Sequence, residues 1–202
     1  MRGPHVVHVV EDDDAARDSL RFLLETAGLA VRAYPSAKPF LNALAEVENG
    51  CVITDVRMPE IDGLELVRSL KRRNYALPVI VITGHADVAL AVEAMKAGAV
   101  DFIEKPYAGE LLLAAVRSAL STYGQDRPAA SQRTEIKTRL TALSVREHQV
   151  LEGLIAGQPD KAIAHGLGIS ARTVEIYRAH VMSKMHAPSL SHLVRMVLIA
   201  EA

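Results

Sequence analysis

Five polar residues stand at the ends of short apolar runs, or directly after them, and together could hold and accept a phosphoryl group. They are Glu11, Asp12, Asp55, Thr83 and Lys105. Carboxylates in one pocket repel one another, so burying three of them requires a compensating cation. Oxygen ligands without histidine or cysteine favour Mg²⁺ or Mn²⁺, and Mg²⁺ usually binds phosphate oxygens together with one or two carboxylates. The residue types therefore predict a metal-assisted phosphate site.

Each residue type suits one part of that chemistry. Lys105 can pair with a phosphoryl oxygen as a point charge, and the Thr83 hydroxyl can hydrogen-bond another. Asp55 is the expected nucleophile, forming an aspartyl phosphate, because it ends a central strand and is held by the sheet rather than by a loop. Acidic residues after a strand commonly cap a helix, and we assign Asp13 and Asp14 to that simpler role.

Five apolar runs of strand length recur along the first part of the chain, with apolar residues at helical spacing between them. The runs cover residues 6–10, 30–34, 51–55, 79–83 and 99–103. Strands that alternate with helices predict an α/β domain whose parallel sheet is covered by helices on both faces. In the flavodoxin-like strand order 2-1-3-4-5, the first and third strands are neighbours. This order would place Glu11 and Asp12 beside Asp55, at the edge of the sheet where ligands bind.

The chain divides near residue 120 into two regions of different character. We assign residues 1–120 to the α/β domain, residues 121–139 to a linker with weak apolar periodicity, and residues 140–202 to an all-α domain. The first 120 residues carry four more acidic than basic side chains, and the remainder carries three more basic than acidic ones. This asymmetry hints that the second region binds nucleic acid.

Two of the four helices expected in the all-α region form a helix-turn-helix. Ser144 and Glu147 are expected to form a capping box at the start of the first helix, and a second helix covers residues 160–166. After a turn, Ser170 is expected to cap a third helix that runs to residue 185, and a last helix covers residues 191–200.

The third helix has a core face and an outer face that could enter a major groove. Val174, Tyr177, Val181 and Met185 share the expected core face. The residues that we expect to contact DNA are Lys161, Ser170, Arg172, Thr173, Glu175, Ile176, Arg178, Ala179, His180 and Lys184.

Composition excludes other classes of protein. The single cysteine, Cys51, rules out a disulfide framework and a cysteine-rich zinc module. No apolar run approaches the roughly 18 residues that a membrane helix needs, and the first residues lack the apolar stretch of a signal peptide. We therefore expect a cytoplasmic protein without a membrane segment.

The first region resembles the receiver domain of bacterial response regulators over residues 4–120. The matching segments are 9–13, 54–59, 62–65, 82–85 and 97–106. The resemblance implies that a sensor histidine kinase phosphorylates Asp55, and that Thr83 and Phe102 form a switch pair. The Mg²⁺ ligands that it implies are Glu11, Asp12, Asp55 and the backbone carbonyl of Arg57. It also implies a cis peptide bond between Lys105 and Pro106, and positions that tune acyl-phosphate hydrolysis at Arg57 and His85.

The second region resembles the LuxR-type DNA-binding domain over residues 139–200. The matching positions include Leu143, Ser144, Arg146, Glu147, Val150, Leu151, Gly157, Lys161, Ile163, Ala164, Lys184, Met185 and the segment 167–175. The resemblance implies binding to double-stranded promoter DNA. Tyr177 stands where histidine is common in that family. The candidates for a dimer interface on the final helix are Leu190, Leu193, Val194 and Val197.

The pair of domains resembles response regulators of the FixJ type. This resemblance implies a transcription regulator that dimerises on phosphorylation, works with RNA polymerase and controls nitrogen-fixation or oxygen-responsive genes. We expect a phosphoacceptor that forms and hydrolyses its own acyl phosphate rather than a turnover enzyme.

Two other functions use similar residues. A Mg²⁺-dependent phosphohydrolase of the haloacid-dehalogenase kind also uses a strand-end aspartate, a threonine and a lysine. Its usual second aspartate is here Arg57, which leaves no evident residue to protonate a leaving group. The other alternative is a receiver adaptor whose helical region does not bind DNA.

Overall fold

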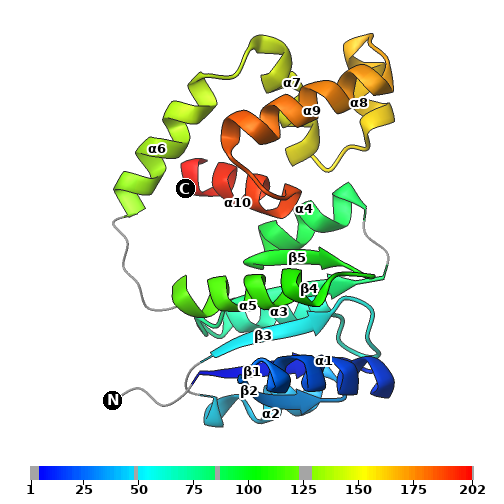
Figure 1. The fold of residues 1–202 in the computed structure, drawn as a ribbon, viewed down its shortest axis with the longest axis vertical. Coiled ribbons are helices and arrows are strands. Elements are labelled where there is room, and N and C mark those ends of the chain that lie inside the picture. Colours follow the sequence, from blue (N-terminus) through cyan, green and yellow to red (C-terminus); the bar gives the residue numbers. More distant parts are fainter. Residues whose placement is uncertain (1–4, 48–49, 85–86, 123–128, 202) are drawn as a thin grey trace. The chain divides into compact units, whose positions relative to one another are not determined.

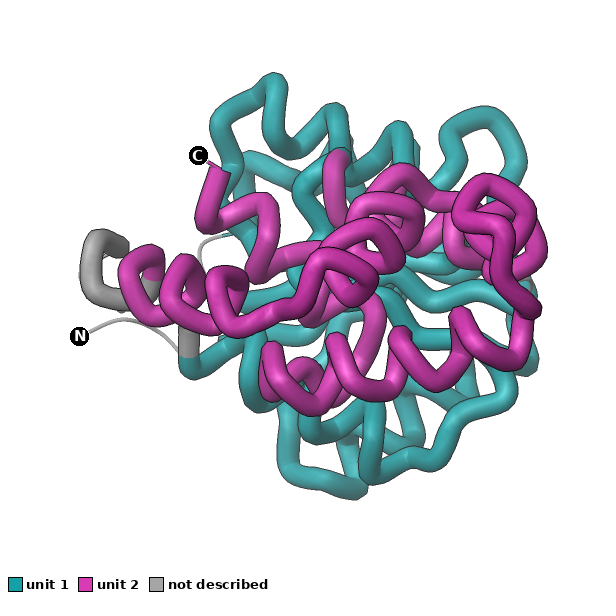
Figure 2. The backbone as a smooth tube through the Cα atoms, turned by 90° about the horizontal axis from the view of Figure 1, so that it is seen from above, with its two compact units in different colours: residues 1–85, 97–125 teal, residues 86–96, 126–202 magenta. Residues whose placement is uncertain are grey.

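The computed structural model describes residues 5–47, 50–84, 87–122 and 129–201, and the chain forms two compact units (Figures 1 and 2). The first unit contains residues 1–85 and 97–125, and the second contains residues 86–96 and 126–202. None of the described helices combines the length and the apolar character that crossing a membrane would require.

The first unit is built on a five-stranded parallel sheet in the order β2-β1-β3-β4-β5, which confirms the predicted fold class. Its strands are β1 (Val6–Val10), β2 (Ala30–Tyr34), β3 (Gly50–Asp55), β4 (Val79–Thr83) and β5 (Asp101–Glu104). The central strand β3 is buried at every residue. Such a run of apolar residues is expected for a parallel strand covered on both faces.

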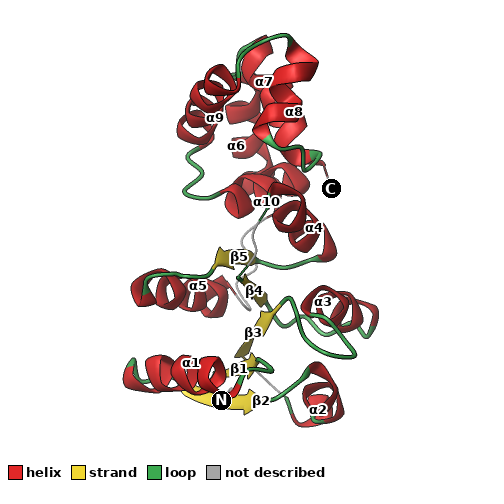
Figure 3. Ribbon diagram, turned by 90° about the vertical axis from the view of Figure 1, so that its right-hand side faces the viewer, coloured by secondary structure: helices red, strands yellow, loops and turns green. Residues whose placement is uncertain are grey.

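Helices cover both faces of this sheet. Figure 3 shows α1 (Asp14–Thr26) and α5 (Gly109–Thr122) on one face, with α2 (Ala37–Asn42) and α3 (Gly63–Arg72) on the other. On the first of these faces, alternate strand residues such as Val7 and Ile53 pack against Leu24 of α1 and Val116 of α5. The short 3-10 helix Leu44–Glu46 follows α2.

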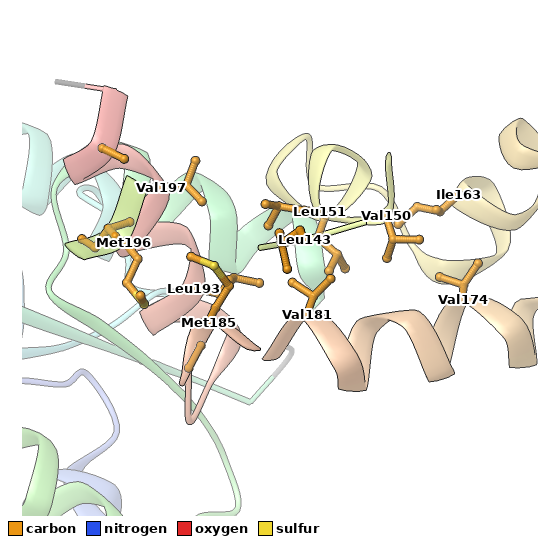
Figure 4. Packing of buried hydrophobic residues seen from close by; sticks show 14 of the residues in the cluster. Leu143, Val150, Leu151, Ile163, Val174, Val181, Met185, Leu193, Met196 and Val197 are labelled. Atoms are coloured by element: carbon orange, nitrogen blue, oxygen red, sulfur yellow. The ribbon is translucent and has the colours of Figure 1, made fainter. Parts of the chain in front are cut away.

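The second unit is helical. It contains α4 (Val88–Ala97) except its last residue, together with α6 (Ala129–Thr141), α7 (Val145–Ile155), α8 (Asp160–Leu167), α9 (Ala171–Met185) and α10 (Leu190–Glu201). Figure 4 shows the core between these helices, where Val150 of α7, Val174 and Val181 of α9 and Leu193 of α10 are fully buried. The capping box of Ser144 and Glu147 is present, and the Ser170 side chain caps α9 as expected.

Helix α6 lies mostly within residues 121–139, the segment expected to be a linker. Its packing explains why the sequence did not reveal it. Among residues 133–141 of α6, whose burial is described, only Ile136 belongs to the buried core cluster, and Leu140 is partly buried. This part of the helix therefore lacks the repeated apolar stripe by which an amphipathic helix is recognised. Part of the predicted linker, residues 123–128, lies outside the described residues.

Gly63 allows α3 to begin directly against the end of β3. Its amide donates to the carbonyl of Val56, and a β-carbon at this position would lie 2.1 Å from the carbonyl oxygen of Asp55. No side chain can be accommodated there without moving the backbone that carries Asp55.

We expect Gly63→Ala to lower the free energy of unfolding of the first unit by about 1–3 kcal/mol, as overpacking usually does. Urea unfolding followed by circular dichroism would measure the change. Gly84→Ala is the matched control, because a β-carbon at Gly84 would meet no atom within 4 Å. Equal stability of the two variants would contradict the proposed role of Gly63.

Candidate functional site

The register of the sheet brings the predicted phosphate-site residues to one edge. Val10 pairs with Thr54 and Asp55 pairs with Ile82, so β1, β3 and β4 end nearly level. The amide of Lys105 donates to the carbonyl of Thr83 at 2.8 Å, which fixes the residue after β5 beside the end of β4. Residues far apart in the sequence therefore meet at the carboxyl edge of the sheet, where parallel α/β sheets bind ligands.

An ammonium group shared by two carboxylates is the centre of this edge. Lys105 Nζ lies 2.8 Å from Asp55 Oδ1 and 2.8 Å from Glu11 Oε2. The carboxylate side chains are only 9% and 3% exposed, respectively, whereas Lys105 retains 27% exposure. Charge-assisted hydrogen bonds of this length are strong, and here they compensate two buried negative charges.

Burial and charge shift the protonation equilibria of this cluster. Burial raises the pKa of Glu11 above its usual value, although Lys105 counteracts that shift. Burial alone would lower the pKa of Lys105, but the hydrogen bonds and charges of Asp55 and Glu11 together raise it. Lys105 therefore stays charged at neutral pH and holds the two carboxylates together.

Both carboxylate oxygens of Asp55 are held in place. Oδ1 accepts from Lys105, and Oδ2 accepts from the backbone amide of Arg57 at 2.6 Å. The side chain of Arg57 is itself exposed. Sequence reasoning had selected Arg57 for its carbonyl and side chain and did not anticipate this amide, because a backbone donor leaves no mark in the residue type. A carboxylate oriented in this way is suited to act as a nucleophile.

Asp12, the third carboxylate of the predicted metal site, follows Glu11 directly in the loop between β1 and α1. Asp12 is exposed, and no group of three or more histidine, cysteine, aspartate or glutamate side chains within residues 5–47, 50–84, 87–122 and 129–201 forms a metal site. The ammonium of Lys105 instead supplies the positive charge that Glu11 and Asp55 require. Asp13 caps α1 as expected, accepting from the Ala16 amide at 2.7 Å.

Arg17 is a residue of this site that sequence reasoning missed. Its guanidinium donates to the carbonyl of Glu11 at 2.8 Å and to that of Asp12 at 3.4 Å, and it also pairs with Asp14. These bonds hold the loop between β1 and α1. Because Asp14 and Arg17 are three residues apart, the sequence suggests only an ion pair on the helix and not the contact of Arg17 with the loop.

The predicted switch residues lie on neighbouring strands. Thr83 ends β4 and is 1% exposed, whereas Phe102 on β5 is partly exposed. The peptide bond between Lys105 and Pro106 is cis, as the resemblance implied. His85, the other position expected to tune hydrolysis, lies outside the described residues.

Helix α9 presents the outer face that the sequence predicted. Arg172, Glu175, Ile176, Ala179 and His180 are all exposed. Of the four expected core residues, Val174, Val181 and Met185 are fully buried, and Tyr177 is partly buried. The apolar side chain of Ile176 is 51% exposed on this face.

Two of the expected DNA-binding cations are engaged with acidic side chains. Arg178 lies 3.6 Å from Asp160 of α8, and Lys184 lies 2.7 Å from Glu147 of α7. Arg172 and Lys161 are exposed and form no ion pair among the described residues. The hydroxyl groups of Ser170 and Thr173 lie 2.8 Å apart at the N-terminal cap of α9.

Glu147 is a buried carboxylate between α7 and α9. Its side chain is 5% exposed and accepts from Lys184 Nζ at 2.7 Å and from the Ser144 amide at 2.6 Å, and His180 Nδ1 lies 3.9 Å away. The hydrogen bond from Lys184, followed by that from the backbone of Ser144, lowers the pKa of Glu147 to about 2.

The candidate dimer residues on α10 are largely covered within the chain. Leu193 and Val197 belong to the hydrophobic core of the second unit, Val194 is fully buried, and Leu190 is partly buried. A dimer formed through this face therefore requires repacking of α10.

Comparison with known proteins identifies two families along the chain. The response regulator receiver domain matches residues 7–117, and the luxR family of bacterial regulatory proteins matches residues 141–197. The transcriptional regulatory protein FixJ of Azorhizobium caulinodans is 54% identical over 194 residues, covering 96% of this chain and 92% of that protein. FixJ of Bradyrhizobium diazoefficiens is 50% identical, covering 96% and 95%.

Solved structures show the same similarity. Full-length FixJ from B. japonicum has a TM-score of 0.59 and 47% identity, covering 99% of this chain and 98% of that chain. The structure described as FixJ-N has a TM-score of 0.56 and 47% identity, covering 60% of this chain and 96% of that one.

The lowered pKa of Glu147 predicts acid sensitivity of the second unit. A carboxyl whose folded-state pKa lies below its unfolded value stabilises the fold above the unfolded value, and that stability is lost as the pH falls through the folded value. We expect this contribution to disappear between pH 4.5 and about 2. Urea unfolding at a series of pH values should show a smaller loss of stability in Glu147→Gln than in the wild-type protein. An identical pH profile in both would contradict the prediction.

Proposed function

Because the chain belongs to the FixJ-type response regulators, which join a receiver domain to a LuxR-type DNA-binding domain, we propose that phosphorylation of Asp55 by a sensor histidine kinase switches its binding to promoter DNA. Proteins of this family regulate transcription and are not in general turnover enzymes. We assign residues 1–120 to the receiver and residues 140–202 to the DNA-binding domain. Most of helix α6 lies between the two domains.

The oriented carboxylate of Asp55 is the observation that carries the proposal. An oxygen of Asp55 attacks the phosphorus of a phosphohistidine, an O–P bond forms, and the P–N bond to the kinase breaks. Lys105 and the Arg57 amide, which already hold the two oxygens, are placed to neutralise charge on the incoming group. Later attack by water on the acyl phosphate would restore the free carboxylate.

The acidic edge of the sheet fits a divalent cation. Receiver domains in general bind Mg²⁺ at the phosphorylation site, where the ion screens the charge of the phosphoryl group. In this chain Glu11, Asp12, Asp55 and the carbonyl of Arg57 would hold it, since carboxylate and carbonyl oxygens are the ligands that Mg²⁺, or Mn²⁺, prefers. The exposed carboxylate of Asp12 is available to join Glu11 and Asp55 at this edge.

Thr83 and Phe102 are the residues through which phosphorylation would change the fold. The Thr83 hydroxyl would donate to a phosphoryl oxygen, and its movement would leave space for the partly exposed ring of Phe102 to turn inward. Burying an aromatic ring is favourable, so the two changes support each other.

Helix α9 is the proposed DNA-reading element. Its exposed residues, together with Lys161 at the start of α8, would contact bases and phosphates in the major groove. We propose that the phosphorylated protein acts as a homodimer with RNA polymerase at its promoters. We propose nitrogen-fixation or oxygen-responsive genes as its targets, as the resemblance of the sequence to the FixJ type implies. Such a regulator would act in the cytoplasm.

Asp55→Asn keeps the shape of the side chain and removes the nucleophile. With Mg²⁺ and beryllofluoride, a phosphate mimic, we expect the wild-type protein to sediment as a dimer and the variant to sediment as the untreated protein does. Asp18→Asn, the same change at an exposed residue of α1 that pairs with Arg21 on the same helix, is the control and should respond like the wild type. Dimerisation of the Asp55→Asn variant on addition of the mimic would contradict the proposal.

Lys105→Met removes the cation shared by Glu11 and Asp55. We expect a lower melting temperature without Mg²⁺, because two buried carboxylates lose their counter-charge. Added Mg²⁺ should raise the melting temperature more in the variant than in the wild type, since no ammonium competes for the oxygens. Thermal unfolding across a Mg²⁺ titration measures both effects, with the exposed Lys71→Met as control. The same response to Mg²⁺ in all three proteins would argue against a metal at this edge.

A further inference from the structure

Polar contacts join the end of α9 to the junction between α6 and α7. The side chains that make them are Arg139, Glu147 and Lys184. Lys184 Nζ donates to Glu147 Oε2 at 2.7 Å and to the carbonyl of Ala142 at 3.4 Å. Arg139, near the end of α6, donates to the carbonyl of Met185 at 3.1 Å. All of these contacts involve the last turn of α9.

We propose that Glu147, acting through Lys184, is a positioning residue that sets the angle at which α9 meets DNA. Lys184 is then an internal tie and not a ligand of DNA phosphate, in contrast to the expectation from sequence. This inference rests on the proposed function of α9 as the DNA-reading helix.

Burial and hydrogen bonding make Glu147 suitable for this role. The carboxylate is nearly inaccessible, so it cannot contact DNA itself. Oε2 accepts from both the Ser144 amide and Lys184, and Oε1 faces His180 at 3.9 Å on the exposed side of α9. The start of α7 thereby fixes the carboxylate, and the carboxylate fixes the lysine.

The apolar packing of α9 leaves its exact angle to such directional contacts. Val174, Val181 and Met185 bury one stripe of the helix, and apolar contact has no preferred direction. Charge-assisted hydrogen bonds are directional and short. Arg178 and Asp160 join α9 to α8, and Glu147 and Lys184 join it to α7, so α9 is restrained from two neighbouring helices.

Glu147→Gln separates the two roles of Lys184, because they predict different effects on DNA binding. Glutamine can still accept from the Ser144 amide, as in many capping boxes, so α7 keeps its cap. If Lys184 is an internal tie, the variant should bind its specific DNA less tightly. If Lys184 binds phosphate, loss of the nearby negative charge should leave DNA binding unchanged or strengthen it.

The experiment uses the full chain with Mg²⁺ and beryllofluoride and a duplex selected by the wild-type protein from a randomised pool. We expect Glu147→Gln to raise the Kd for this duplex roughly tenfold, the size of effect typical of a broken charged contact. The Kd for a scrambled duplex should not change, since phosphate contacts remain. A Kd for the selected duplex that is equal to or below that of the wild type would overturn the inference.

Lys184→Met tests the same point without altering the capping box. Each phosphate contact contributes about 0.9 to the slope of log K against log salt concentration. We expect Lys184→Met to weaken binding to the selected duplex while keeping the wild-type salt slope. The double variant with Glu147→Gln should bind that duplex no less tightly than the weaker-binding single variant does. Lys184→Arg, which keeps the positive charge, should bind the selected duplex as the wild type does. Arg172→Gln, which alters an exposed cation on the same helix, is the control and should lower the slope.

The outcomes distinguish the two proposals. A fall in slope of about 0.9 in Lys184→Met would identify Lys184 as a phosphate ligand and overturn the positioning role alone. A wild-type protein that enriches no duplex would overturn the DNA-binding function, and the positioning role with it. Circular dichroism of each variant verifies that the helices are intact.

Discussion

The ammonium of Lys105, held between Asp55 and Glu11, is the interaction on which the first unit's site depends. Lys105 is 94 residues from Glu11 and 50 residues from Asp55 in the sequence, so no local element can create this contact. Only a parallel sheet whose β1, β3 and β4 end nearly level, with β5 delivering Lys105 to the end of β4, brings the three side chains together. Without the lysine, the carboxylates of Glu11 and Asp55 would share a buried edge with no counter-charge from the protein, which is a costly arrangement.

Strands β1, β3 and β4 were predictable because each contains a compact run of apolar, mostly β-branched residues, and the strand order was expected from the flavodoxin-like fold. The end residues of those strands then indicated phosphate chemistry. The partners of individual charges were not predictable. From the sequence, Lys105 was expected to bind only an incoming phosphoryl group and Lys184 only DNA. Each instead has an acidic partner far along the chain, which a reading of local patterns cannot supply.

Helices were hardest to predict from the sequence where few of their residues are buried. Helix α6 contributes Ile136 to the buried core and otherwise carries mostly polar residues, so its sequence reads as a linker. Its Arg139 nevertheless bonds to the carbonyl of Met185 at the end of α9. The short helix α2 lies where a helix was expected between the second and third strands, but its six residues, which include Pro39, give too little periodicity to set its bounds. In both cases tertiary contacts define an element that local preference alone does not.

The engagement of Arg178 and Lys184 with acidic partners also bears on how a regulator finds its promoter. A chromosome offers a vast excess of unrelated sequence, and positive charge on the reading helix increases retention there regardless of sequence. With α9 as the proposed DNA-reading helix, the pairing of those two cations and the exposed acidic side chain of Glu175 would weaken its attraction to arbitrary DNA. The protein would then remain on the chromosome mainly through shape and base contacts at its specific site, and it would dissociate quickly from other sequences.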